Sequence, residues 1–152
     1  AHEPGEYREA IEQAISEADG LLKTFRALLA IAQIEAGTAG KDWAAVNLAD
    51  LVTDVTDLYE AAAEAQGLEF VSDVAPGIEV GGNRHLLAQA LGNLLDNAIK
   101  YTPQGGRVEL AAKRVDGAPV LVVSDSGPGI SLADRKRVQE RFARLDSART
   151  TP

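Results

Sequence analysis

Three polar residues recur at helical spacing within residues 83–101, and their types suit metal and phosphate binding. On a helical wheel of about 100° per residue, Asn93, Asn97 and Lys100 fall on one side. The opposite side carries Leu87, Leu91, Leu94, Leu95 and Ala98. Asparagine is disfavoured inside helices, because its side chain competes for backbone hydrogen bonds. The trio is either a solvent face that carries amides or a Mg²⁺–phosphate site, where neutral amide oxygens ligate the metal and a lysine offsets phosphate charge.

A second candidate site is the loop at residues 125–130, Asp-Ser-Gly-Pro-Gly-Ile, which follows an apolar run at 120–123. Glycines let a backbone approach a ligand closely, and a carboxylate here can accept a hydrogen bond from the amino group of adenine. Guanine has a carbonyl at that place, and an unpaired buried polar group costs about 1–3 kcal/mol. Taken alone, the pattern is weak and is more typical of a structural turn. It is not the phosphate loop that ends in Lys-Ser/Thr, which the sequence lacks.

The elements that would position these residues follow from hydrophobic periodicity and from capping and turn residues. The predicted helices and strands are a helix at 5–36, a helix at 47–65 capped by Asn47, a strand at 68–74, a helix at 83–101, strands at 107–114 and 119–125 joined near 116–117, and a short helix at 133–140 capped by Ser131. The apolar side predicted for the second helix consists of Leu48, Leu51, Val52, Val55, Leu58, Tyr59 and Ala62. The run at 120–123 is almost wholly apolar, so its strand is expected in the centre of the sheet. This order predicts an α+β fold, a two-layer α/β sandwich with helices on one face of a mixed sheet, preceded by one long helix.

The first predicted helix carries an apolar stripe along its length and is expected to end at Gly37. A helix with such a stripe needs a partner helix. It is either a packed helix of a single domain or one arm of a dimerisation bundle. Residues 38–46 are expected to form a linker to the rest of the chain.

Composition narrows the function further. The 152 residues are 45% apolar, which suits one modest domain plus an appendage, and the net charge of −8 argues against nucleic acid as a partner. The absence of cysteine excludes disulfides, cysteine-based zinc sites and thiol catalysis. No apolar run approaches the roughly 18 residues of a membrane span. The sequence contains no methionine, so we expect it to be a piece of a longer protein.

The two motifs, in this order, resemble the catalytic domain of bacterial sensor histidine kinases in two-component systems, a branch of the gyrase B, Hsp90 and MutL superfamily. Residues 93–103 resemble the N box, residues 125–130 the G1 box, and residues 140–146 the F box of the ATP lid. Residues 28–37 are similar to the end of the second helix of the kinase dimerisation hairpin. Residues 82–87 resemble the Gly-Asp-Arg-x-Leu-Leu start of the N-box helix, with Asn83 in place of the usual Asp.

The resemblance implies roles for single residues. Asn97 would ligate Mg²⁺ with help from Asn93, Lys100 and Tyr101 would contact the phosphates or the nucleotide, and Asn93, Asn97 and Lys100 would form the catalytic set. Asp125 would bind the adenine amino group. The other nucleotide-binding positions would be the lid hinge and the base pocket: Gly127, Gly129, Ile130 and Phe142.

Asn93 also discriminates within the superfamily. In gyrase-like relatives its position is a glutamate that activates water, and an asparagine cannot act as a general base. This difference favours transfer of the γ-phosphate to a protein over hydrolysis.

The implied protein is an ATP- and Mg²⁺-dependent protein-histidine kinase with a Bergerat-type ATP-binding fold. It would phosphorylate a histidine on the dimerisation helix, for relay to an aspartate of a response-regulator receiver domain. Residues 1–37 would be the second helix of the dimerisation hairpin, residues 38–46 the linker, and residues 47–152 the ATP-binding domain, truncated before the second Gly-rich loop. The parent is expected to be a homodimeric inner-membrane receptor with this domain in the cytoplasm.

The kinase H box has no match, because His2-Glu3 is followed by Pro4-Gly5 and His85 suits a surface position. No phosphoacceptor is therefore expected in this chain, and the piece alone is not expected to autophosphorylate. One alternative is a degenerate docking or phosphotransfer adaptor, against which the presence of Asn97 and Asp125 argues. The other alternative is a hydrolase of the same superfamily or an anti-sigma-type serine kinase. Asn93 and the similarity of residues 28–37 to the end of the dimerisation hairpin argue against it.

Overall fold

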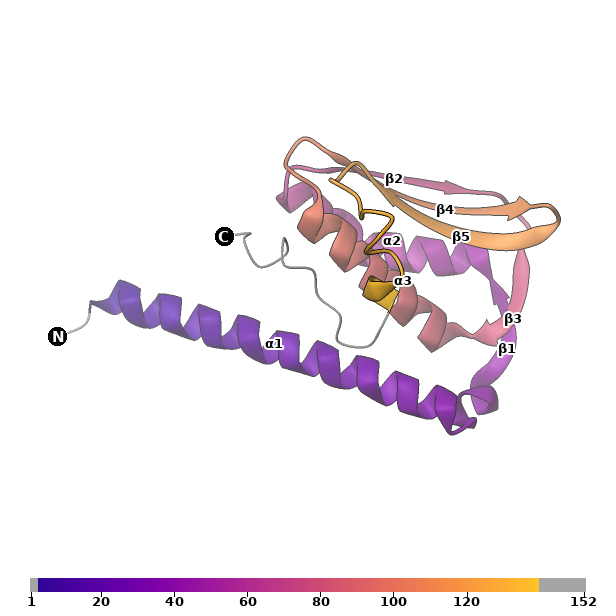
Figure 1. The fold of residues 1–152 in the computed structure, drawn as a ribbon, viewed down its shortest axis with the longest axis horizontal. Coiled ribbons are helices and arrows are strands. Elements are labelled where there is room, and N and C mark those ends of the chain that lie inside the picture. The colour runs from indigo at the N-terminus through magenta and orange to yellow at the C-terminus, as the bar shows by residue number, and fades with distance from the viewer. Residues whose placement is uncertain (1–2, 140–152) are drawn as a thin grey trace.

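The computed structural model describes residues 3–139, which form an α+β fold as the sequence predicts. The elements in chain order are α1 (Pro4–Glu35), the 3-10 helix η1 (Thr38–Asp42), β1 (Trp43–Asn47), α2 (Leu48–Ala65), β2 (Glu69–Val74), β3 (Glu79–Asn83), α3 (Arg84–Tyr101), β4 (Arg107–Val115), β5 (Ala118–Asp125) and the 3-10 helix η2 (Arg137–Gln139). Strands β2, β4 and β5 form a mixed sheet, and α2 and α3 cover one face of it (Figure 1). The order is β2-β4-β5, with β2 parallel and β5 antiparallel to β4.

Local signals set the helix boundaries close to their predicted places. The Asn47 side chain accepts a hydrogen bond from the Asp50 backbone N–H at 3.2 Å, so the predicted cap of α2 is confirmed. Asn83 caps α3 in the same way, because its side chain accepts from the Leu86 N–H at 3.1 Å. The first helix ends where expected, with Gly37 in the left-handed conformation at φ 74°.

A second, two-stranded sheet was not predicted. Strand β1 occupies residues 43–47, within the expected linker, and pairs antiparallel with β3, which also has no counterpart among the predicted strands. Both strands are short, and alanine in β1 and glycine in β3 disfavour strands. Their pairing joins segments that lie far apart in the sequence, so no local pattern reveals it.

The position predicted for the apolar strand is also wrong. Among the described strands, β4 is central and β5 lies at the edge of its sheet. Burial follows this order, because β4 contains Val108, Leu110 and Ala112 as fully covered residues, whereas the apolar residues of β5 are only half-buried. An uninterrupted apolar run indicates contact on both faces of a strand, but it does not specify which strand has two neighbours.

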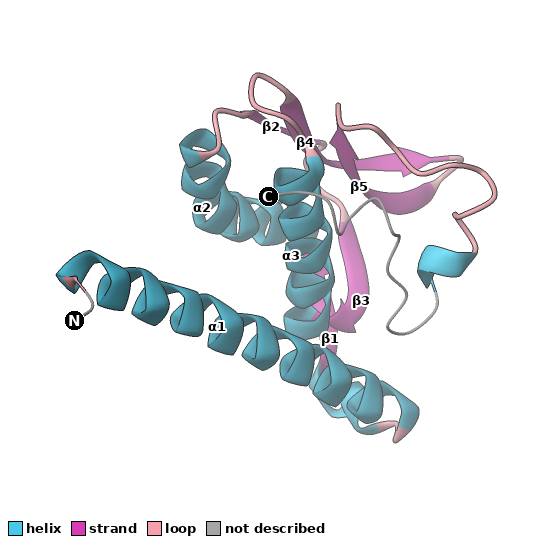
Figure 2. Cartoon of the chain, turned by 60° about the vertical axis from the view of Figure 1, so that its left-hand side comes forward, coloured by secondary structure: helices cyan, strands magenta, loops and turns pink. Residues whose placement is uncertain are grey.

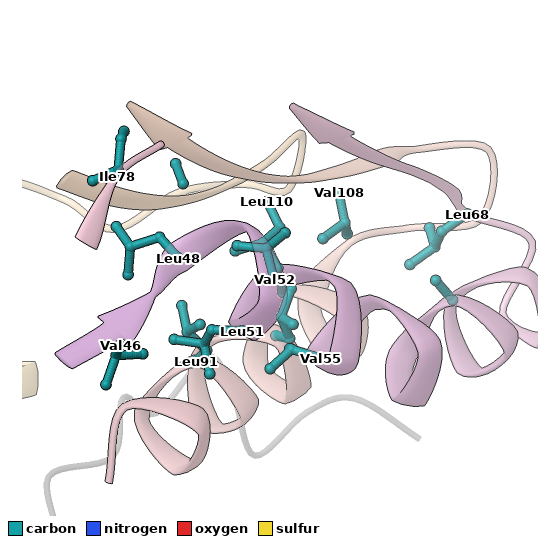
Figure 3. Packing of buried hydrophobic residues seen from close by; sticks show 14 residues of the cluster. Val46, Leu48, Leu51, Val52, Val55, Leu68, Ile78, Leu91, Val108 and Leu110 are labelled. Atoms are coloured by element: carbon teal, nitrogen blue, oxygen red, sulfur yellow. The ribbon is translucent and has the colours of Figure 1, made fainter. Parts of the chain in front are cut away.

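The hydrophobic core lies between the sheet and the two helices (Figure 3). Helix α2 buries Leu48, Leu51, Val52, Val55 and Ala63, and α3 buries Leu91, Gly92, Leu95 and Ala98. Three predicted core positions are wrong: Leu58 is 74% exposed, Leu94 is 52% exposed, and Ala62 is exposed while its neighbour Ala63 is buried. These residues lie at the margins of the apolar stripes, where the wheel cannot separate the core from its rim.

Helix α1 lies outside the two layers (Figure 2). None of its residues is buried, although it carries large apolar side chains. An ion pair joins it to the rest of the molecule, from Lys23 to Asp96 of α3. Within residues 3–139, none of the helices is both long enough and apolar enough for a membrane span.

The segment after β5 differs from its prediction. Instead of an α-helix at 133–140, turns are followed by the single 3-10 turn of η2. Ser131 does not cap through its side chain, because its hydroxyl donates to the Asp134 carboxylate at 2.8 Å. The predicted F box at 140–146 lies outside the described residues.

Candidate functional site

Helix α3 presents its polar residues away from the core, as the wheel predicts. Asn97 and Lys100 are exposed and Asn93 is half-buried, whereas Leu95 and Ala98 are buried. The Lys100 ammonium lies 5.2 Å from the centre of the Tyr101 ring, within range of a cation–π contact. The Asn97 amide and the Lys100 ammonium therefore face solvent, where the amide could ligate a cation and the ammonium could contact an anion.

A close contact with α2 fixes the middle of α3. Gly92 is buried there, and a Cβ at this position would lie 2.7 Å from the Tyr59 hydroxyl. Burial, with a smaller contribution from the Asp96 carboxylate, raises the pKa of Tyr59 above its usual value, so the phenol stays neutral at physiological pH. Glycine in a helix costs about 1 kcal/mol of stability relative to alanine. Here the missing side chain of Gly92, the residue before Asn93, leaves room for Tyr59 to pack against α3.

The loop at residues 125–130 starts at the end of β5. The Asp125 Oδ1 accepts a hydrogen bond from the Gly127 N–H at 2.8 Å. Ser126 holds the loop to β4, because its Oγ accepts from the Arg107 N–H at 2.8 Å and its N–H donates to the Arg107 carbonyl at 3.0 Å. The position of the carboxylate is thus determined by the sheet, whereas the residues after it leave the sheet.

The two predicted motifs meet at the C-terminal end of α3. A Cβ at Gly127 would lie only 3.1 Å from the carbonyl oxygen of Tyr101, so the loop passes directly against the last turn of the helix. Gly106 makes a similar approach, since a Cβ there would lie 2.8 Å from the Ser126 hydroxyl. Close backbone contact therefore requires glycine at both positions and places the Asp125 loop beside the helix that carries the asparagines.

The hydroxyl of Thr102, which the sequence analysis did not single out, lies at the same junction. The residue is 6% exposed, and its Oγ1 has no hydrogen-bond partner within residues 3–139. Thr102 lies within the segment 93–103 that resembles the N box, but the resemblance assigns it no role. Only the fold reveals that it is both buried and adjacent to the loop.

The donor set fits Mg²⁺ held together with a phosphate ligand rather than a cage made by protein alone. No group of three or more His, Cys, Asp or Glu side chains is placed to hold a metal ion within the described part of the chain. Mg²⁺ usually keeps several waters and takes few protein ligands alongside substrate phosphates. The exposed amide of Asn97 and the half-buried amide of Asn93 satisfy that requirement.

The remaining predicted residues have less defined surroundings. Gly129 has φ 73°, Ile130 is partly exposed, and Phe142 lies outside the described residues. His85 is exposed near the start of α3, as expected for a surface residue. A separate cavity of about 590 Å³ lies between the C-terminal end of α1 and the β1–β3 sheet, and none of the predicted site residues lines it.

Comparison with known proteins identifies the family of the chain. Residues 82–152 match the family described as histidine kinase-, DNA gyrase B-, and HSP90-like ATPase. The solved structure of the mycobacterial sensor histidine kinase MprB is 34% identical to this chain, with a TM-score of 0.64, and the match covers 72% of this chain and 70% of the solved MprB chain. The chain belongs to the sensor histidine kinase family.

Two further relatives extend the match upstream into α1. The sensor-like histidine kinase SenX3 of Mycolicibacterium smegmatis is 30% identical over 150 residues, which is 99% of this chain and 39% of SenX3. The structure of full-length ShkA in complex with AMPPNP is 28% identical, with a TM-score of 0.75, and covers 95% of this chain and 31% of ShkA. This kinase chain therefore spans well under half of these relatives and contains the ATP-binding domain of the family.

Proposed function

We propose that this chain is the ATP-binding catalytic core of a two-component sensor kinase, which transfers the γ-phosphate of ATP to a histidine. The observation that carries the proposal is the contact between loop 125–130 and the last turn of α3, beside the exposed amides of that helix. A single nucleotide could then bind with its base at Asp125 and its phosphates near Asn97. The AMPPNP bound to the similar kinase ShkA supports an adenine nucleotide as the ligand.

In this proposal the base is selected by charge and hydrogen bonding. Asp125 accepts a hydrogen bond from the exocyclic amino group of adenine, which a guanine carbonyl cannot replace. Ile130 contributes apolar surface to the base pocket, and Gly127 and Gly129 allow the lid that follows to move over the nucleotide. Phe142 belongs to that lid.

The polar face of α3 binds the other end of the nucleotide. Asn97 would hold Mg²⁺ through its amide oxygen, with Asn93 assisting, and Lys100 and Tyr101 would contact the phosphates. When bound, Mg²⁺ neutralises part of the phosphate charge and helps to orient the γ-phosphate. Lys100 adds a positive charge that stabilises the same group.

The chemistry proposed here is transfer to protein and not hydrolysis. A nitrogen of the acceptor imidazole attacks the γ-phosphorus, the bond from that phosphorus to the bridging oxygen breaks, and ADP leaves. Asn93 holds no proton-accepting group, so this site lacks the base that would activate water. The phosphoryl group would then pass to an aspartate of a response-regulator receiver domain.

Helix α1 has a proposed role in assembly. Its exposed apolar residues suit the second helix of a dimerisation hairpin, with residues 38–46 joining it to the ATP-binding domain at 47–152. The whole protein would then be a homodimer whose other hairpin helix supplies the acceptor histidine. We place it in the inner membrane as a receptor, with this domain on the cytoplasmic side, where ATP and receiver domains are found.

A titration of this chain with AMPPNP by calorimetry, with and without Mg²⁺, tests the proposal. We expect binding that Mg²⁺ strengthens. Asn97→Ala should weaken binding about ten- to hundredfold in the presence of Mg²⁺ and remove the metal dependence, because a hydrogen bond or ligand to a charged group contributes on the order of 1.5–3 kcal/mol. His85→Ala on the same helix is the control and should bind as the unmodified chain does.

The alternative, a degenerate docking or phosphotransfer adaptor, predicts a different result. Such a module has no need for Asn97 or Asp125 and would bind neither AMPPNP nor Mg²⁺. Absence of binding in both titrations would therefore contradict the kinase proposal. Binding with equal affinity in the Asn97→Ala variant would contradict the metal assignment alone.

A further inference from the structure

The side chain of Thr102 has a defined orientation at the junction of α3 and the Asp125 loop. A Cβ at Gly106 would lie 2.3 Å from the Thr102 methyl carbon, and a Cβ at Gly127 would lie 3.5 Å from its hydroxyl oxygen. The methyl group therefore faces the turn before β4, and the hydroxyl faces the nucleotide loop. The same Gly127 position would lie 2.8 Å from Oδ1 of Asp125, so the hydroxyl and the carboxylate both flank this glycine.

Two other threonines show how a threonine hydroxyl within a helix finds a hydrogen-bond partner. Thr24 and Thr53 lie within helices and donate to the carbonyl four residues earlier, at 3.1 and 2.9 Å. Thr102 has left the helical conformation, with ψ 124°, and only its backbone N–H reaches the carbonyl of Ala98. A buried hydroxyl without a partner is disfavoured, so its retention here calls for a partner in another state of the site.

The Asp125 carboxylate is the complementary group. An ionised carboxylate only accepts hydrogen bonds, and a threonine hydroxyl can donate one. In the structure, Oδ1 is engaged by the Gly127 N–H. Thr102 lies directly after the last residue of α3, so its hydroxyl is a donor held beside this carboxylate and is placed to take over the contact if the loop shifts when a nucleotide binds.

Resting on the proposed adenine site, we propose that Thr102 is a positioning residue for Asp125. Its hydroxyl donates to the carboxylate in the nucleotide-bound state and holds the second oxygen toward the adenine amino group. The residue does not contact the nucleotide itself. It acts through Asp125, so its effect depends on that carboxylate.

Calorimetric titration with ADP and Mg²⁺ tests this role in five variants of the chain, one of which is Asp125→Asn alone. Thr102→Val keeps the branched shape and removes the hydroxyl, and we expect it to weaken ADP binding about tenfold. Thr102→Ser restores the donor and should bind within about twofold of the unmodified chain. Thr56→Val is the matched control, because Thr56 of α2 also has a buried hydroxyl without a partner in residues 3–139 and lies outside the site. It should bind ADP as the unmodified chain does.

The double variant, Thr102→Val combined with Asp125→Asn, separates positioning from a structural role. If Thr102 acts through the carboxylate, the double variant binds ADP as weakly as Asp125→Asn alone, within about twofold. Urea unfolding should show that Thr102→Val is as stable as the unmodified chain or more stable, so the weaker binding is not a folding defect.

Each contrary result has a distinct meaning. Unchanged ADP affinity in Thr102→Val, or an equal loss with and without Asp125→Asn, overturns the role of Thr102 and leaves the adenine site standing. Failure of the unmodified chain to bind ADP overturns the proposed function, and the role of Thr102 with it.

Discussion

Helices α1 and α2 carry similar apolar stripes, yet they bury them to opposite extents. Five residues of α2 are buried between α3 and the sheet, whereas none of the 32 residues of α1 is buried. The exposed apolar side chains of α1 include Leu21, Leu22 and Phe25. The difference shows that periodicity determines the side of a helix that needs a partner, but not whether the same chain supplies that partner.

The residues of the candidate site belong to the core of the molecule and not to α1. Asn93, Asn97 and Asp125 all belong to elements that pack around the α2–α3–sheet core, the asparagines to α3 and Asp125 to the end of β5. Helix α1 contacts this body through the Lys23–Asp96 ion pair, which is partly exposed. Stability of the nucleotide site should therefore depend on the core and hardly at all on α1.

The largest expected difference between α1 and α2 is the loss of stability when a large apolar side chain is truncated. Leu51 of α2 is fully buried, and Leu51→Ala should lower the free energy of unfolding by about 2–5 kcal/mol. The matched change in α1 is Leu21→Ala, which removes a side chain that is 73% exposed. It should change the free energy of unfolding of the ATP-binding domain by less than about 0.5 kcal/mol. Urea unfolding of both variants measures this; similar losses would mean that α1 belongs to the core.

A smaller effect is expected from two glycines in the middle of helices. Gly92→Ala would place a methyl group against the Tyr59 hydroxyl and should destabilise the domain by about 1–3 kcal/mol. In α1, a Cβ at Gly20 would have nothing within 4 Å. Gly20→Ala should therefore stabilise the helix by a few tenths to about 1 kcal/mol and raise its helix content. Circular dichroism follows the helix signal, and thermal unfolding follows the domain.

The control for this pair is Tyr59→Phe, which removes the hydroxyl that the new methyl group would meet. The double variant Gly92→Ala/Tyr59→Phe should recover most of the stability lost in Gly92→Ala. No recovery would mean that Gly92 is required for a reason other than its contact with Tyr59.

The smallest effect concerns the contact between the two regions. Lys23→Ala breaks the ion pair with Asp96, and exposed ion pairs contribute about 0–1 kcal/mol. The free energy of unfolding should therefore fall by no more than about 1 kcal/mol, and by less at high salt, where the charges are screened. Urea unfolding at low and high salt checks this; a loss above 2 kcal/mol would show that the ion pair is a structural part of the domain.

Features determined by local sequence could be predicted, and features determined by pairing could not. Asn47 caps α2 as predicted because the signal and its effect lie within three residues of each other. The α+β class and the polar side of α3 follow from periodicity alone. Strands β1 and β3 were missed because each is a weak strand that forms through the other, and β5 was placed in the centre because its apolar run does not report its neighbours.

The candidate site divides in the same way. Asn93, Asn97 and Asp125 could be singled out by residue type and spacing, and the fold brings the loop against the end of α3. Thr102 could not, since its significance lies in a buried hydroxyl and in two glycines that approach it from different parts of the chain. A single sequence contains no sign of such a contact.

An adenine nucleotide site at the junction of α3 and β5 can be located by mapping amide chemical shifts with nuclear magnetic resonance during titration with ADP and Mg²⁺. We expect the shift changes to concentrate at residues 93–102 and 125–130, while residues 4–30 of α1 keep their signals. The single tryptophan, Trp43, lines the separate apolar cavity, so its indole signal should also stay in place. Shifts centred on Trp43, or no shifts at the junction under saturating ADP, would contradict the account.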